Sequence, residues 1–110
     1  MAFYKILRAP EWEAFAAKGR FAGSADDLAS GFIHLSTAGQ VRDTAALHFA
    51  GEDGLVLLTL DKTRLEPSLK WEPSRGGEDF PHLYRDLQIE DVIFYQDLPL
   101  EGGAHAFPDL

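Results

Sequence analysis

A strongly apolar run in the middle of the chain, Leu55 to Leu60, limits the possible folds more than any other sequence feature. It holds six residues rich in Leu and Val, a usual length for a strand and too short for most helices. Runs of this kind are typical of strands that are covered on both faces. A membrane-spanning helix needs roughly 20 apolar residues. The sequence therefore predicts a buried strand and no membrane span.

The first twenty residues predict a strand followed by an amphipathic helix. Residues 2–7 are mostly apolar and aromatic, as in many strands. Pro10 suits the first turn of a helix, where its missing amide proton costs nothing. One face of that helix would carry Trp12, Phe15 and Ala16. Gly19 can take the left-handed conformation that ends helices, so we expect the helix to end near Lys18.

Two further helices are expected from capping residues. Ser24 can cap a short helical turn through Leu28, within a loop of small and acidic residues. Thr37 followed by Gln40 matches a capping box, in which each side chain satisfies a free backbone amide of the other. We expect the second helix to run from this box to about Ala50.

The remaining segments are short and predict strands separated by turns. Strands are expected at residues 31–36, 54–60, 69–72, 81–84 and 92–95. Turns are expected at residues 73–77 and 88–91, and the last ten residues look irregular. The sequence thus predicts an α+β fold, with a small mixed, mainly antiparallel sheet and two main helices. The length favours a single domain over residues 1–110.

Charge and composition narrow the classes of partner. The chain has 10 Lys and Arg against 18 Asp and Glu, a net charge of −8. This charge repels phosphate backbones and anionic lipid at long range, so non-specific nucleic-acid binding is not expected. Cysteine is absent and charged residues interrupt the first twenty positions, which favours a cytoplasmic protein without a secretory signal. The oligomeric state is left open.

His34 and Ser36 are the first candidate site residues. They lie two positions apart on an expected strand, so their side chains project from the same face with Cα atoms about 7 Å apart. They could contact one ligand. The alternative is structural: His34 would be a hydrogen-bonded histidine near the core, and Ser36 a helix cap.

The segment from Lys70 to Arg85 is the second candidate, because its charges balance within an acidic chain. Its glycine-rich turn could let backbone amides and a guanidinium approach a phosphate, and its aromatic rings could stack on a base. The candidate ligand-binding residues are Trp71, Ser74, Arg75, Gly76, His82 and Tyr84. The alternative is that the aromatic residues belong to the core and that Arg75 forms a surface ion pair.

Metal binding and serine hydrolysis are not indicated by the sequence. The four histidines lack the short regular spacing of a zinc-binding helix, so no metal site is expected. No nucleophile-elbow pattern surrounds a serine.

Three blocks of the sequence together resemble a family of small bacterial proteins known as domain of unknown function 952. The blocks are residues 32–36, 55–58 and 71–84. The family is similar to a compact ADP-ribosyltransferase fold, and two of its strands resemble those of RNA 2'-phosphotransferases, which use NAD. The resemblance implies a nucleotide- or NAD-like ligand at these candidate residues. It assigns catalytic roles to His34, which would orient a ribose, and to Glu72, which would stabilise an oxocarbenium-like centre.

Three functions are consistent with these patterns. The first is an enzyme of the ADP-ribosyltransferase type. The second is a module that binds a small anionic or nucleotide-like molecule without chemistry, because the first strand, Tyr4 to Leu7, lacks the His-Gly pair that such transferases place against NAD. The third is a structural or interaction protein in which the polar cluster only organises the core.

Overall fold

The computed structural model describes residues 2–110, and of Arg75 it describes the backbone alone. The helices are α1 (Ala9–Lys18), α2 (Ala25–Ser30), α3 (Val41–His48) and α4 (Lys62–Leu65). The strands are β1 (Ala2–Arg8), β2 (Arg20–Phe21), β3 (Ile33–His34), β4 (Leu55–Asp61), β5 (Leu69–Pro73), β6 (Asp79–Leu83), β7 (Leu87–Gln88), β8 (Val92–Leu98), β9 (Leu100–Glu101) and β10 (Ala104–His105). Short 3-10 helices cover Glu66–Ser68, Arg75–Gly77 and Ile89–Asp91.

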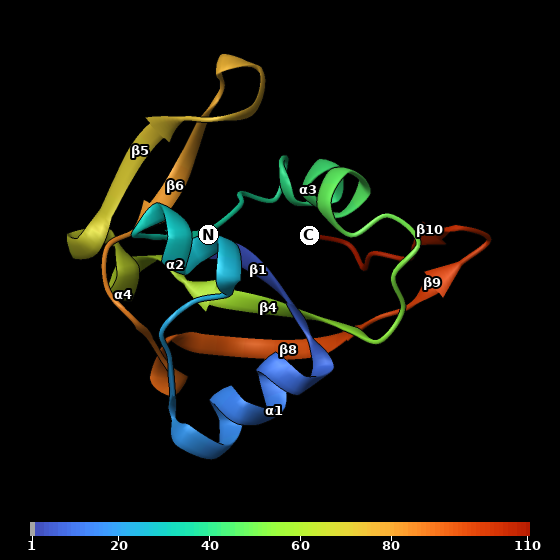
Figure 1. Ribbon diagram of the computed structural model, residues 1–110, viewed down its shortest axis with the longest axis horizontal. Coiled ribbons are helices and arrows are strands. Elements are labelled where there is room, and N and C mark those ends of the chain that lie inside the picture. Colours follow the sequence, from blue (N-terminus) through green and yellow to red (C-terminus); the bar gives the residue numbers. More distant parts are fainter. Residues whose placement is uncertain (1) are drawn as a thin grey trace.

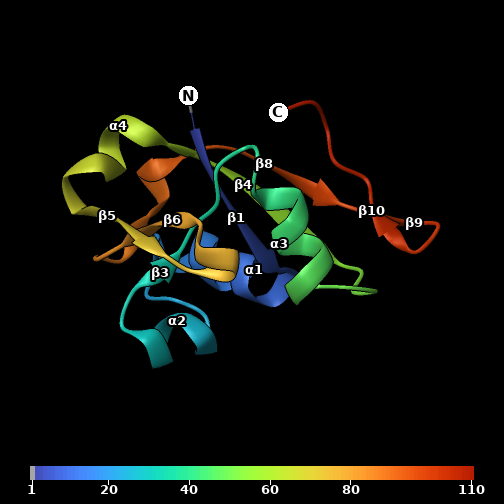
Figure 2. The same ribbon diagram turned by 90° about the horizontal axis from the view of Figure 1, so that it is seen from above.

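The central sheet has the order β1-β4-β8 and is antiparallel throughout. Helix α1 lies on one side of this sheet and α3 on the other, as the two views of the ribbon show (Figure 1, Figure 2). The apolar run that the sequence placed in a buried strand is β4, the middle strand. It has neighbours on both edges and helices over both faces, which confirms the expectation for residues 55–60.

Side chains that alternate along β1 and β4 divide between two hydrophobic clusters, because successive residues of a strand point to opposite faces. The cluster on the α1 side contains Phe3, Leu7, Phe15, Val56, Leu58 and Leu60, among others. The cluster on the α3 side contains Tyr4, Ile6, Val41, Ala45, Leu55 and Leu57, among others. This division explains why the β4 segment is apolar at nearly every position.

A second antiparallel sheet has the order β3-β6-β5. Tyr4 and Ser36 join it to the central sheet, since each backbone amide donates to the other's carbonyl, at 2.8 and 3.0 Å. Just before this bridge, the Leu35 amide donates to the Pro81 carbonyl. The chain after β3 therefore spans from β6 to β1 and lies between the two sheets.

The helices begin and end close to the predicted positions, with one correction. Helix α1 ends at Lys18, with Gly19 at φ 76°, as the sequence predicted. Ser24 caps α2 by accepting from the Asp27 amide. The expected helix from Thr37 to Ala50 is shorter, because α3 covers only Val41–His48. One half of the predicted capping box is present, because the Thr37 amide donates to the Gln40 side-chain oxygen. The Gln40 side-chain amide also donates to the Asp79 carbonyl, which holds residues 37–40 in a turn against β6.

The expected strands are present, although their lengths differ. The strand predicted at residues 31–36 is reduced to Ile33–His34, and the strand predicted at 92–95 extends to Leu98. The last ten residues were expected to be irregular, and this was wrong in part. They contribute to the β9–β10 hairpin, in which Ala104 pairs with Glu101 and His105 with Leu100. The α+β class with antiparallel sheets and few helices is confirmed.

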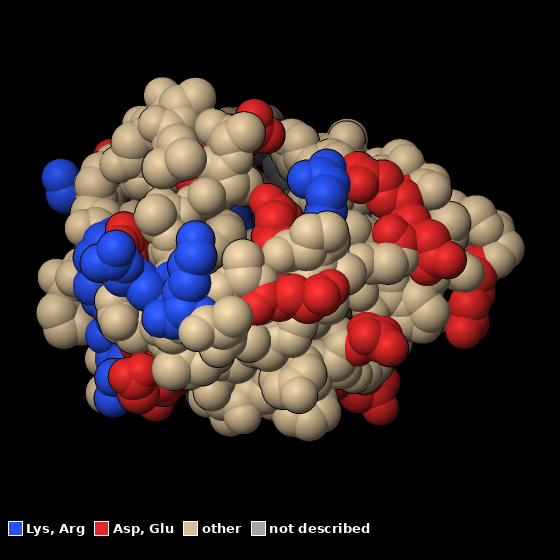
Figure 3. All heavy atoms as spheres, turned by 60° about the horizontal axis from the view of Figure 1, so that its bottom comes forward, with Lys and Arg blue, Asp and Glu red and all other residues tan. Residues whose placement is uncertain are grey.

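Charged side chains are unevenly spread on the face shown in Figure 3. Lys and Arg gather on the left of this view, the side that holds α4 and β5 in Figure 1, whereas Asp and Glu dominate the centre and right. Within residues 2–110, no helix has the length and apolar character needed to cross a bilayer.

Candidate functional site

A cleft of about 330 Å³ opens where β1, β3 and β6 face α2 and α3. It lies at the junction of the two sheets, beside the Tyr4–Ser36 bridge. Apolar side chains line part of it: Tyr4, Ile6, Leu35, Val41, Phe49 and Phe80. Polar side chains line the rest, including Lys5, Asp27, His34, Ser36, Ser74 and His82. Apolar walls with a few polar groups are the usual composition of a small-molecule site.

Asp27 is the most highly connected of these residues. The capping turn of α2 places it, because its carboxylate accepts from the Ser24 amide at 2.9 Å. The carboxylate also pairs with the Lys5 ammonium at 3.0 Å and accepts from the His34 amide at 3.0 Å. Burial would raise the pKa of Asp27, but the hydrogen bond from the His34 ring and the charge of Lys5 lower it well below its ordinary range. Asp27 is therefore a buried, ionised carboxylate.

The ring of His34 is held by this carboxylate. Its Nδ1 lies 2.7 Å from Asp27 Oδ1. An ionised carboxylate can only accept hydrogen bonds, so Nδ1 must carry the proton. In the neutral ring, Nε2 is then left with a lone pair. His34 lines the cleft and its side chain is 38% exposed, so the ring can contact a bound molecule.

His82 has the same arrangement with Glu72 as its partner. Its Nδ1 lies 2.8 Å from Glu72 Oε1, which also accepts from the Tyr84 hydroxyl at 2.6 Å. The hydrogen bonds from Tyr84 and His82 lower the pKa of Glu72, so this carboxylate is also ionised and Nδ1 of His82 carries the proton. Nε2 of His82 is buried and has no hydrogen-bond partner among the described residues. Such a group is rare in native proteins and calls for an explanation.

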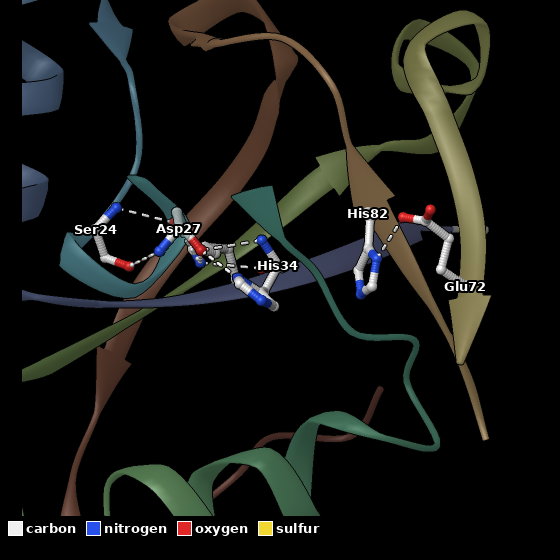
Figure 4. Close-up of polar contacts among 6 residues, drawn as sticks. Ser24, Asp27, His34, Glu72 and His82 are labelled. Atoms are coloured by element: carbon white, nitrogen blue, oxygen red, sulfur yellow. Dashed lines mark hydrogen bonds and ion pairs between the residues drawn. The ribbon is translucent and has the colours of Figure 1, made fainter. Parts of the chain in front are cut away.

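The two rings are neighbours because β3 and β6 pair in a register that sets His34 directly opposite His82. Their ring centroids are 5.5 Å apart, and the angle between the ring planes is 68°. Phe32 packs over both rings and stacks on His82 at 4.0 Å, which closes one side. In Figure 4, His34 and His82 lie between the carboxylates of Asp27 and Glu72, and both histidine rings are turned to the same side of the strands. Two carboxylate–histidine pairs thus lie side by side at one cleft.

The other predicted site residues divide into two groups. Ser36 and Ser74 line the cleft with His34 and His82, and the Ser36 hydroxyl lies 2.9 Å from that of Thr44. Trp71, Glu72, Gly76 and Tyr84 are outside its lining. Trp71 packs edge-on against Phe3 and is half exposed, and Glu72 and Tyr84 lie behind His82. The predicted contact of the Arg75 side chain with an anion lies outside the described part of the chain.

Sequence reasoning missed Lys5 and Asp27. The spacing of Ser24 and Asp27 is that of a capping box, and the structure has both of its reciprocal hydrogen bonds. This signal could have placed Asp27 at the start of a helix. It could not have indicated the partners of the carboxylate, because Lys5 and His34 come from β1 and β3. Lys5 carried another signal, since it is a charged residue in the middle of a strand whose other interior positions are apolar or aromatic.

Residues 6–95 match the family described as "Protein of unknown function (DUF952)", and the chain belongs to this family. It is similar to the crystal structure of protein CC0527 from Caulobacter crescentus, with 50% sequence identity and a TM-score of 0.91, over 96% of this chain and 94% of that one. A solution NMR structure of CC0527 is also similar, with 51% identity and a TM-score of 0.84, over 94% of this chain and 90% of that one. No curated protein matches the sequence.

Proposed function

We propose that the protein binds a small nucleotide-like molecule in the cleft between the two sheets. The observation that carries this proposal is the composition of the cleft: ring nitrogens held by carboxylates, and hydroxyl groups, lie among apolar and aromatic side chains. A nucleoside has matching parts, because its base is flat and weakly polar and its sugar carries hydroxyls. The volume of about 330 Å³ is at the lower end for ligand sites, which suits a mononucleotide or one half of NAD better than a whole dinucleotide.

The resemblance to ADP-ribosyltransferases and RNA 2'-phosphotransferases belongs to this proposal and supports the same ligand class. Binding is better supported than transfer of an ADP-ribosyl group. Such a reaction needs a group that stabilises positive charge on the ribose, and Glu72 was the acidic candidate for that role. The Glu72 carboxylate is engaged by His82 and Tyr84, outside the lining of the cleft. Glu72 would act on a ligand through His82 and not by direct contact.

Filling the cleft tests the proposal without touching its polar groups. Ala29 and Ala25 are both exposed on α2, but only Ala29 lines the cleft. We expect Ala29→Phe to weaken binding of AMP, ADP-ribose or NAD by tenfold or more, while Ala25→Phe changes it by less than twofold. Isothermal titration calorimetry measures both variants against the unmodified protein.

Thermal unfolding provides the companion measurement. A ligand at 100 times its Kd adds about 2.7 kcal/mol of stability. For a chain of this size that raises the Tm by roughly 10 °C or more. The proposal is wrong if none of the three ligands raises the Tm of the unmodified protein. It is also wrong if Ala29→Phe and Ala25→Phe bind the ligand equally well.

A further inference from the structure

A role in stabilising the fold explains neither the unpartnered Nε2 of His82 nor the Nε2 of the neighbouring His34. Each ring is already anchored through Nδ1 to an ionised carboxylate. Neutral imidazoles that donate Nδ1–H to a carboxylate and offer Nε2 are the usual arrangement of histidine ligands to metal ions, because the carboxylate orients the ring and makes the free nitrogen more basic. Both rings of the pair have Nδ1 bonded to a carboxylate in this way.

The spacing of the rings fits one shared ion. A zinc ion bound 2.0–2.1 Å from each Nε2 in a tetrahedral arrangement would set the two ring centroids about 5 Å apart. The observed separation is 5.5 Å, with an interplanar angle of 68°. The backbone pairing of β3 with β6 sets this spacing of the rings, so an ion could bind without a rearrangement of the strands.

The charge around the pair favours a cation. Among the described side chains that line the cleft or back the two rings, Lys5 and Lys70 are positive and Asp26, Asp27 and Glu72 are negative. The Lys5 charge is already paired with Asp27. An anionic group placed alone between the rings would face this excess of negative charge, whereas a divalent cation would reduce it.

We propose that His34 and His82 together bind a divalent transition-metal ion of the zinc class through their Nε2 atoms. Imidazole nitrogens suit zinc, copper and nickel, and a hard ion such as magnesium prefers oxygen. The described residues place no third His, Cys, Asp or Glu to complete the coordination sphere. Water or an oxygen atom of a bound molecule fills the remaining positions. The ion would thereby offset the negative charge of the cleft toward an anionic ligand, although its own binding does not depend on one.

The test uses the full chain without an affinity tag and zinc chloride alone. Asn can keep a donor near the position of Nδ1 and has no counterpart of Nε2, so His34→Asn and His82→Asn remove the proposed ligands with the least damage to the fold. The matched control is His105→Asn, because His105 lies in β10 and its Nε2 is bonded to the Glu52 carbonyl. Isothermal titration should give one zinc ion per chain, and each of the first two variants should weaken binding at least tenfold. The control should bind within twofold of the unmodified protein, and magnesium should not bind at this site.

Two further measurements separate metal binding from loss of fold. Zinc should shift the Nε2 resonances of both rings in histidine-selective NMR spectra of the unmodified protein, while Nδ1 stays protonated. Glu72→Gln should weaken zinc binding by about 10- to 100-fold, as expected for a positioning residue. Absence of zinc binding, or binding that persists unchanged in both His→Asn variants, overturns the proposal. Because nucleotide is absent from these experiments, that outcome leaves the proposed nucleotide site to its own test.

Discussion

At the scale of single residues, Asp27 determines the geometry of the cleft. Its side chain is almost completely buried, and it connects the start of α2 to Lys5 on β1 and to both the backbone and the ring of His34. Burying two opposite charges is costly, and the cost is offset only while the pair and its hydrogen bonds are complete. Asp27 therefore serves the stability of the fold as well as the orientation of His34.

Substitution of Asp27 should be among the most destabilising changes at the cleft. Asp27→Asn leaves the Lys5 ammonium buried without a counter-charge, so we expect the free energy of unfolding to fall by about 3 kcal/mol. Urea denaturation at pH 7 measures this. Asp26→Asn, at the exposed neighbouring position of α2, should change stability by less than about 0.5 kcal/mol. A loss below 1 kcal/mol for Asp27→Asn would show that the buried pair is not required.

At the scale of elements, Asp91 links segments that are distant in the sequence. Its buried carboxylate accepts from Arg64 of α4 at 3.1 Å and from Arg85, which follows β6, at 2.8 Å. It also accepts from the Gln88 amide at the end of β7. Burial would raise the pKa of Asp91, but the hydrogen bonds from Arg85, Gln88 and Arg64 lower it. This carboxylate holds the connection into β8 against α4.

The pH dependence of stability should reveal this link. Because the pKa of Asp91 is lower in the folded protein than in the unfolded chain, protonation favours unfolding. Its contribution is complete above the unfolded pKa of about 4 and is lost as the pH falls through the folded value. The difference in unfolding free energy between the unmodified protein and Asp91→Asn should be constant from pH 7 to about pH 5 and shrink below about pH 4. Urea titrations across this range measure it, and a difference that persists undiminished at pH 3 would contradict the assignment.

Elements with a local signal were predictable from the sequence. Strands β1 and β4 have apolar runs, and Gly19 and Ser24 mark helix ends whose conformation depends on neighbouring residues alone. The late start of α3 was not predictable, because Gln40 bonds to Asp79, which is 39 positions away. Likewise the sequence drew attention to His34 and His82. It could not show that they pair across two strands, or that Asp27 and Glu72 fix their tautomers.

At the scale of the whole molecule, two sheets meet at the Tyr4–Ser36 bridge, and the cleft lies at their junction. The junction brings together side chains from the first strand, the α2 turn and the β5–β6 hairpin. None of these segments contains a recognisable motif by itself. The arrangement of two carboxylate–histidine pairs is therefore a property of the fold and not of any single segment.

The geometry of the cleft rests on two carboxylates that hold His34 and His82 through protonated Nδ1 atoms and leave Nε2 unprotonated. Long-range proton–nitrogen NMR correlation of the histidine rings, at a pH where they are neutral, tests it most directly. The structure predicts that His34 and His82 both show a protonated Nδ1 and an unprotonated Nε2. Glu72→Gln should alter the pattern of His82 and leave that of His34 unchanged. If either neutral ring in the unmodified protein carries its proton on Nε2, its Nδ1 does not donate to the carboxylate and the site is not arranged in this way.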